Sequence, residues 1–263
     1  MELNLGGKVA LVAAASRGLG RAVAEELAEE GASLILCARD EVRLRQTCDE
    51  IRQKSNVSVL GVTADLSKTA DVERLFREAI EQYGRVDILV TNVGGPPAGT
   101  FENLSRESWQ EATELILTSV LDLTRLALPD MKKRRWGRIL NITSIASKQP
   151  VENLILSNSL RAAVTGFAKT LADEVAPFGI TVNNILPGYT RTERVEQLAE
   201  TIAEKEGISA AEVKARWESA IPMKRLGEPH EFAALAAFLV SERASYITGS
   251  SIAVDGGWIR SLF

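Results

Sequence analysis

Short apolar runs alternate along the chain with longer stretches in which apolar residues recur at helical spacing. The short runs are nearly continuous in Val, Ile, Leu and Ala, which is typical of parallel strands covered on both faces. The expected strands are Lys8–Ala13, Ser33–Ala38, Val57–Thr63, Ile88–Val93, Gly137–Thr143, Thr181–Leu186 and Ser251–Val254. The expected helices are Leu19–Glu30, Glu41–Lys54, Ala70–Tyr83, Arg106–Lys133, Ile155–Phe178 and His230–Ser241. This alternation, with right-handed crossovers, predicts an α/β fold with one doubly wound, mostly parallel seven-stranded sheet and helices on both faces.

Capping residues mark several of the expected helix ends. Ser67 and Ser105 are expected N-caps, because a serine hydroxyl accepts from free N–H groups of the first turn. Gly31, Gly84 and Gly179 follow expected helix ends, where a left-handed residue is common. No linker, repeat or low-complexity stretch divides the chain, so residues 1–263 are expected to form a single domain.

The segment 192–223 interrupts the alternation of strands and helices. It contains two charged stretches of helical pattern, VEQLAETIAEKEG and AAEVKARWES, between a strand and the last long helix. An insertion after the carboxyl end of a strand lies on the side where open sheets bind ligands. It is therefore a candidate substrate lid, although a solvated helical excursion explains the pattern equally well.

Charge and composition narrow the classes of partner. The net charge is −4, so there is no overall basic field to attract nucleic acid or an anionic membrane. The local basic run, residues 132–135, is interpreted as a solvated helix end. No run of 18 apolar residues and no signal sequence is visible, which predicts a soluble, cytoplasmic protein. Cys37 and Cys48 lack metal-ligand spacing and His230 is the only histidine, so we expect free thiols and no metal site.

A glycine-containing turn follows the first expected strand and leads into the first helix. It reads AAASRGLG over residues 13–20. Glycines at such a turn let the backbone approach a pyrophosphate, while the helix N-terminus supplies free N–H groups. The match to G-x-G-x-x-G is poor, so the turn by itself is a weak signal for a dinucleotide-binding Rossmann domain.

The end of the second expected strand bears on the choice of cofactor. Its tip carries Arg39 and Asp40, and Arg17 lies in the glycine turn. An arginine accommodates the 2′-phosphate of NADP, whereas an acidic residue at the tip binds the ribose hydroxyls of NAD. The two cations favour NADP(H), and Asp40 leaves NAD(H) open unless its carboxylate caps the following helix.

Further candidate residues lie at the ends of the third and fourth strands. Asp65 and Leu66 follow one strand, and Asn92 and Gly94 follow the next. These strand ends form the expected rim of the cofactor crevice. Asp65 is a candidate acceptor for the adenine amino group, and Gly94 allows close passage of the backbone beside the ribose.

Taken in order, these motifs resemble the short-chain dehydrogenase/reductase superfamily over nearly the whole chain. The glycine turn resembles T-G-x-x-x-G-x-G with Ala13 and Ala14 at the first two positions, and TNVG resembles N-N-A-G. ITVNNILPG and YITGSSIAVDGG are similar to two further segments of the family, especially its 3-oxoacyl-carrier-protein reductase-like branch. The resemblance implies an NADP(H) site and a homotetramer, or a dimer. The cofactor residues it implies, together with those above, are Ala14, Ser16, Arg17, Gly18, Leu19, Gly20, Arg39, Asp65, Leu66, Asn92, Gly94, Arg161, Ile185, Pro187, Gly188 and Thr192.

The catalytic positions of that family are only partly matched. The family uses a Tyr as acid, a Lys four residues later, a Ser thirteen residues before the Tyr, and an Asn on the preceding long helix. Ser144 matches the Ser, but the other positions fall on Ser157, Arg161 and Ile116. Without the resemblance, Ser157 and Arg161 on one helix face are interpreted as a solvated helix start with a snorkelling arginine.

These replacements are not chemically equivalent. A serine hydroxyl is a much weaker acid than a phenol, an arginine does not deprotonate, and isoleucine cannot relay protons. Tyr189 follows Pro187 and Gly188, on a loop that the family places beside the nicotinamide, so it is the tyrosine to consider as a replacement acid. A purely structural tyrosine at that turn is the competing interpretation.

Two functions follow from this pattern. One is an NADP(H)-dependent oxidoreductase with an atypical active site that contains Ser144, Ser157, Arg161 and Tyr189 and acts on a carbonyl or alcohol substrate such as a 3-oxoacyl thioester. The other is an NADP(H)-binding protein without turnover, which acts as a sensor or as a partner subunit.

Overall fold

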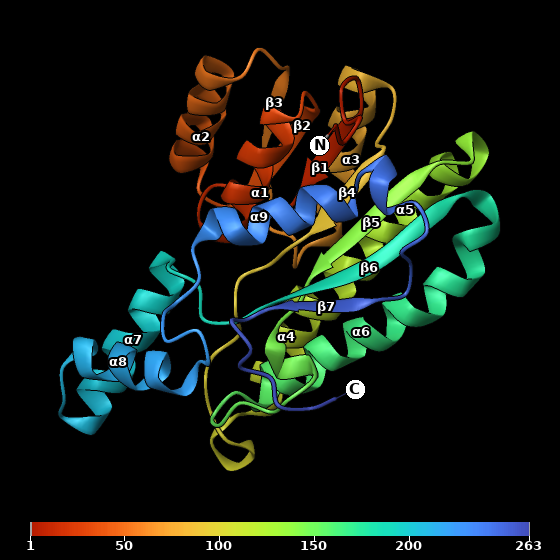
Figure 1. The fold of residues 1–263 in the computed structure, drawn as a ribbon. Helices are drawn as coiled ribbons and strands as arrows, with labels where there is room; N and C mark the ends of the chain where they lie inside the picture. Colours follow the sequence, from red (N-terminus) through yellow and green to blue (C-terminus); the bar gives the residue numbers. More distant parts are fainter. Residues whose placement is uncertain (1, 263) are drawn as a thin grey trace.

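The computed structural model describes residues 2–262 and contains one seven-stranded sheet with helices on both faces (Figure 1). The strand order is β3-β2-β1-β4-β5-β6-β7, and all neighbouring strands pair in parallel. The strands are β1 Val9–Val12, β2 Ser33–Ala38, β3 Val59–Thr63, β4 Ile88–Thr91, β5 Gly137–Ile142, β6 Ile180–Pro187 and β7 Ser251–Val254. The predicted doubly wound α/β fold is confirmed.

Helices divide between the two faces of the sheet. They are α1 Gly18–Glu29, α2 Glu41–Lys54, α3 Thr69–Tyr83, α4 Arg106–Thr113, α5 Ser119–Arg134, α6 Ile155–Val175, α7 Glu193–Glu206, α8 Ala210–Ala220 and α9 Pro229–Leu239. One core joins α1, α2 and α9 to the sheet, and a second joins α3, α5 and α6 to its other face. Successive strand residues serve opposite cores, with Ala10 and Val12 in the first and Val9 and Leu11 in the second. Both faces are therefore buried, which explains the continuous apolar runs.

The expected caps are mostly present. Ser105 accepts from the backbone N–H of Ser108 and caps α4, and Gly31, Gly84 and Gly179 have positive φ after their helices. Ser67 is not an N-cap: α3 begins at Thr69 after Lys68. The hydroxyl of Ser67 instead donates to Asp65 Oδ1 at 2.8 Å, so it is already engaged.

The long helix predicted over 106–133 is continuous but not regular. Between α4 and α5 it contains a π-helical segment, Glu114–Thr118, and Ile116 lies there with 1% of its surface exposed. Near the other end, Arg134 pairs with the buried carboxylate of Asp87 and donates to the Val86 carbonyl. The basic run is therefore not simply solvated, because one of its arginines neutralises a buried acid.

The inserted segment forms the two predicted helices, α7 and α8, which extend beyond the carboxyl end of the sheet (Figure 1). They have a small core of their own that includes Ala199, Val213 and Trp217. Among the described residues, no helix has the length and apolar character to cross a membrane. The same part of the chain contains no cluster of three metal-ligating side chains.

A buried polar chain crosses the sheet close to the crevice. Thr91 donates to Asn141, Asn141 to Asn184, and Asn184 to Ser251, with donor–acceptor distances of 2.7, 3.1 and 3.0 Å. Each of these four side chains thereby has a partner on a neighbouring strand, as buried polar groups require. These hydrogen bonds link β4, β5, β6 and β7 across the sheet.

Candidate active site

The carboxyl ends of the strands surround two adjoining cavities of about 580 and 330 Å³. Ala14, Arg17, Val93 and Gly94 line both, at the point between β1 and β4 where the strand order reverses. Ligands of open α/β sheets bind at such a reversal. We call the larger cavity the adenosine pocket and the smaller one the substrate pocket, after the parts of the ligands that the family resemblance implies for them.

The glycine turn is shaped by close backbone packing. Gly18 begins α1 with φ +60°, and a side chain on Gly20 would stand 2.5 Å from the Ala14 carbonyl oxygen. Ala14 itself has φ +49°, a left-handed conformation that is strained for alanine. The backbone at Ala14 thus keeps the conformation of a glycine, although the side chain is that of alanine.

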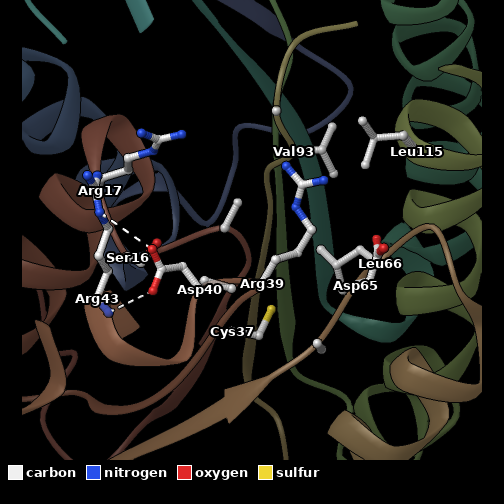
Figure 2. Close-up of a pocket in the computed structure, with 14 residues that line it drawn as sticks. Ser16, Arg17, Cys37, Arg39, Asp40, Arg43, Asp65, Leu66, Val93 and Leu115 are labelled. Atoms are coloured by element: carbon white, nitrogen blue, oxygen red, sulfur yellow. Dashed lines mark hydrogen bonds and ion pairs between the residues drawn. The ribbon is translucent and has the colours of Figure 1, made fainter. Parts of the chain in front are cut away.

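Three arginines line the adenosine pocket, and Figure 2 shows Arg39 lying between the Asp40 and Asp65 sides of it. Arg17, Arg39 and Arg43 are all exposed. Asp40 accepts from the backbone N–H of Arg43 at 3.0 Å and lies 3.5 Å from its side chain. Asp40 therefore caps α2, which is the alternative that the sequence left open.

Helix α7 contacts two residues of this pocket through one carboxylate. Glu193, the first residue of α7, accepts from Arg17 at 2.7 Å and from Arg43 at 2.9 Å. These hydrogen bonds, first from Arg43 and then from Arg17, lower the pKa of Glu193. A single acidic side chain therefore links the inserted segment to the glycine turn and to α2.

The strand-end residues Asp65 and Leu66 also line the adenosine pocket. Asp65 Oδ1 accepts from both the backbone and the hydroxyl of Ser67, at 3.2 and 2.8 Å. Its contact with an adenine amino group stays a prediction.

The four residues predicted as catalytic all line the substrate pocket: Ser144, Ser157, Arg161 and Tyr189. Ser144 follows β5, and its Oγ accepts from the backbone N–H of Ala146 at 3.1 Å, which fixes the hydroxyl at the end of the strand. Ser157 lies on the inner face of α6 with 8% of its surface exposed. The interpretation of a solvated helix start is therefore wrong for this face.

Arg161 is buried one turn further along α6, with 8% of its surface exposed. Its Nη1 donates to the Ile142 carbonyl at 3.1 Å. Burial, with a smaller contribution from the nearby charge of Arg194, lowers the pKa of Arg161 to about 10. The guanidinium is still charged at neutral pH.

Tyr189 is held in an aromatic cluster at the mouth of the substrate pocket. Its ring stacks on Trp217 with centroids 4.6 Å apart and meets the edge of Trp258 at 6.2 Å. Burial raises its pKa, which makes it a poorer acid at neutral pH. Of the other tyrosines, Tyr83 bonds the Leu34 carbonyl far from the site and Tyr246 is fully exposed.

Most of the predicted cofactor residues are brought together, and some lining residues were missed. Gly20 lines neither cavity, because it packs against Ala14 and Asn92, and Ile185 lines neither because it is fully buried in β6. Val93, Arg43 and Arg194 line the cavities without having been predicted. Arg43 had a sequence signal, since it stands three residues after the cap Asp40 and so faces the strand tip, whereas Arg194 had none.

Comparison with known proteins gives consistent matches. A family model described as "Enoyl-(Acyl carrier protein) reductase" matches residues 13–259. The 3-oxoacyl-[acyl-carrier-protein] reductase FabG of Aquifex aeolicus is 36% identical, over 98% of this chain and 99% of the relative. The NADPH-dependent reductase BacG of Bacillus subtilis is 35% identical, over 97% of this chain and 99% of the relative.

A solved structure agrees over the full length. L-sorbose reductase from Gluconobacter frateurii, in complex with NADPH and L-sorbose, superposes with a TM-score of 0.95 and 34% identity, covering 100% of both chains. The match therefore includes the inserted helices as well as the sheet. Fold, site and relatives together place the chain in the short-chain dehydrogenase/reductase superfamily, among its 3-oxoacyl-carrier-protein reductase-like oxidoreductases.

Proposed function

We propose that the chain is an NADP(H)-dependent oxidoreductase with an atypical active site. It catalyses the reduction of a carbonyl compound or the reverse reaction, the oxidation of the corresponding alcohol. The observation that carries this proposal is the convergence of Ser144, Ser157 and Arg161 on one pocket, which opens directly onto the glycine turn. A dinucleotide that spans both cavities would place its reactive end beside these three side chains.

The residues present fit NADP(H). The left-handed Gly18 and the start of α1 offer free N–H groups for the pyrophosphate. Arg17, Arg39 and Arg43 supply positive charge for a 2′-phosphate, while Asp40 is occupied as a cap. The NADPH-dependent reductase BacG and the sorbose reductase in complex with NADPH support the same cofactor.

The side chains of the substrate pocket have different roles in the proposed carbonyl reduction. The bound cofactor supplies the hydride. The hydroxyls of Ser144 and Ser157 donate hydrogen bonds to the carbonyl oxygen, and the positive charge of Arg161 stabilises the negative charge that develops there. Because no side chain in this set is a good acid at neutral pH, the proton comes from water through a serine hydroxyl.

The names of the relatives suggest 3-oxoacyl thioesters as one substrate class to test. The helices α7 and α8 act in this proposal as the lid over the pocket, because Thr192, Arg194 and Leu198 contribute to its lining. A homotetramer or a dimer stays a prediction, which sedimentation of the purified chain would test.

A second candidate is an NADP(H)-binding protein without turnover. Two observations favour it: Ile116 puts an apolar side chain on the relay position, and burial makes Tyr189 a poorer acid. In that case the protein binds the cofactor without turnover and acts as a sensor or as a partner subunit.

Turnover separates the two. NADPH oxidation is measured with purified protein and a panel of 3-oxoacyl esters, diketones, quinones, oxo acids and aldehydes. Reduction of a panel member, lost in Ser144→Ala and Ser157→Ala but retained in Tyr189→Phe, supports the reductase. If NADPH binds and nothing is reduced above background, while Ser157→Tyr with Arg161→Lys creates activity, the binding protein is favoured instead.

A further inference from the structure

Two guanidinium groups face the substrate pocket without an acidic partner. Among residues 2–262, neither Arg161 nor Arg194 lies within 4.0 Å of a carboxylate. Arg194, in the first turn of α7, donates to the Pro96 carbonyl at 3.5 Å and lies at the exposed rim of the pocket. Arg161 lines the same pocket from α6, and the charge of Arg194 contributes to the lowered pKa of Arg161.

A second buried arginine shows how this protein satisfies such a group when its role is structural. Arg138, 2% exposed, donates to the carbonyls of Gly137, Gly179 and Ser241, pairs with Glu242 at 3.5 Å, and stacks on Trp136 at 4.5 Å. Arg161 donates to one carbonyl, and the charge that adds to its lowered pKa is that of another arginine, Arg194. A buried charge without a counter-ion is strongly unfavourable, so the arrangement indicates an anion that arrives with the ligand.

The family resemblance implies a cofactor role for Arg161, but the anionic groups of the cofactor have other partners. Its phosphates are assigned to the start of α1 and to Arg17, Arg39 and Arg43, which line the adenosine pocket. Arg161 and Arg194 do not line that pocket. They lie with Ser144 and Ser157 at the end of the cleft where the carbonyl is expected to bind.

We propose that the substrate carries its own carboxylate, bound between Arg161 and Arg194, so that the physiological substrate is an oxo acid rather than a neutral thioester. This rests on the proposed reductase function and narrows its substrate class. A guanidinium presents several N–H donors in a planar fork that matches a carboxylate, and only one nitrogen of Arg161 is used by Ile142. Val151, Leu154 and Leu198 complete the pocket and suit a short apolar chain.

The reaction balances with components already named. An oxo acid takes up one hydride from NADPH and one proton from water, which gives the hydroxy acid and NADP⁺. The carboxylate stays unchanged and serves only to orient the neighbouring carbonyl toward Ser144 and Ser157.

The test first measures binding without turnover. The full chain, saturated with NADPH, is titrated with hexanoate and with hexanamide, and binding is followed by calorimetry. Hexanoate is expected to bind at least about 30-fold more tightly than the amide, with little change between pH 6 and 9 because Arg161 stays charged there. Arg194→Gln is expected to weaken the binding of hexanoate about tenfold and to leave the dissociation constants of hexanamide and NADPH unchanged.

Arg191→Gln is the matched control. Arg191 lies three residues earlier, just before α7, is also exposed, and pairs with Glu218 and Glu228 outside the pocket. This variant is expected to leave all three affinities unchanged. Equal binding of hexanoate and hexanamide to the wild type overturns the proposal. So does an equal loss of NADPH and hexanoate affinity in Arg194→Gln, since the arginine would then serve the cofactor.

Turnover is measured next with 2-oxohexanoate and 5-oxohexanoate, with their methyl esters, and with an acetoacetyl thioester. Reduction of an acid at least about 30-fold more efficiently than its ester, lost in Arg194→Gln, supports the proposal. If the thioester is reduced as well as the acids and Arg194→Gln changes neither, the reductase function stands and the carboxylate site is overturned. If hexanoate binds selectively and no carbonyl compound is reduced, the carboxylate site stands and the reductase function fails.

Discussion

The two ends of the cleft use arginine in opposite ways. In the adenosine pocket, Arg17 and Arg43 are exposed and already share the carboxylate of Glu193, so an arriving phosphate replaces an existing partner. In the substrate pocket, Arg161 is buried and has no acidic partner among the described residues, so the proposed substrate anion would displace no carboxylate from it. Exposed pairs contribute little to stability and exchange easily, whereas a buried unpaired charge costs stability and is retained for function.

The largest expected effect comes from comparing Arg161 with Arg138. Arg161→Met is expected to raise the free energy of unfolding by about 1 kcal/mol or more, because it removes a buried charge that has no counter-ion. The same variant is expected to lose at least about 100-fold in kcat/KM on the best carbonyl substrate. Chemical denaturation and NADPH-coupled assays measure the two effects.

Arg138→Met is the matched control for that comparison, and it is expected to lower the free energy of unfolding by about 2 kcal/mol, since Arg138 is fully partnered. If both variants lose stability alike, the two buried arginines do not differ as proposed.

A smaller effect is expected at the adenosine end. Arg39→Ala removes a cation that extends into the pocket, which is expected to weaken NADPH about tenfold, or about 1.4 kcal/mol, and NADH hardly at all. Fluorescence titration with both cofactors measures this. Arg45→Ala, an exposed arginine of α2 that pairs with Glu41 outside the pocket, is the control. An equal loss of affinity for NADPH and NADH would contradict the assignment of Arg39 to the 2′-phosphate.

The contrast between the ends also explains what the sequence could predict. The strands and the crevice rim follow from local patterns, since apolar runs and strand ends are written in consecutive residues. The ion-pair partners of charged side chains cannot be predicted in this way, because they are far apart in the sequence: Glu193 contacts Arg17 across 176 positions of the chain. Ser157 and Arg161 could be placed on one helix face, yet their burial depended on how α6 packs against the sheet.

The π-helical segment and the left-handed Ala14 escaped prediction for a related reason. Neither Glu114–Thr118 nor Ala14 has a residue type that demands its conformation, so surrounding structure imposes both. The polar chain from Thr91 to Ser251 is likewise visible only when the strands are paired.

The imposed conformation of Ala14 gives a third, smaller prediction. Ala14→Gly is expected to raise the free energy of unfolding by about 0.5–1 kcal/mol, because relief of the left-handed strain exceeds the added entropy of the unfolded chain. Ala13→Gly, at a buried neighbouring position without positive φ, is expected to lower it by about 1 kcal/mol. Thermal and urea denaturation measure both, and a loss of stability in Ala14→Gly would show that the strain is already relieved by packing.

The smallest expected effect concerns Glu193, whose carboxylate the 2′-phosphate would displace from Arg17 and Arg43. Its pKa is lowered by Arg43 and Arg17, so its carboxylate is ionised at neutral pH and competes with the 2′-phosphate for both arginines. Glu193→Gln is therefore expected to bind NADPH about threefold more tightly and to leave NADH unchanged. Glu196→Gln, which removes a carboxylate paired with Lys214 within the inserted segment, is expected to change neither cofactor. Weaker NADPH binding in Glu193→Gln would mean instead that the carboxylate holds Arg17 and Arg43 in position for the phosphate, and the difference between the two ends of the cleft would then be one of burial alone.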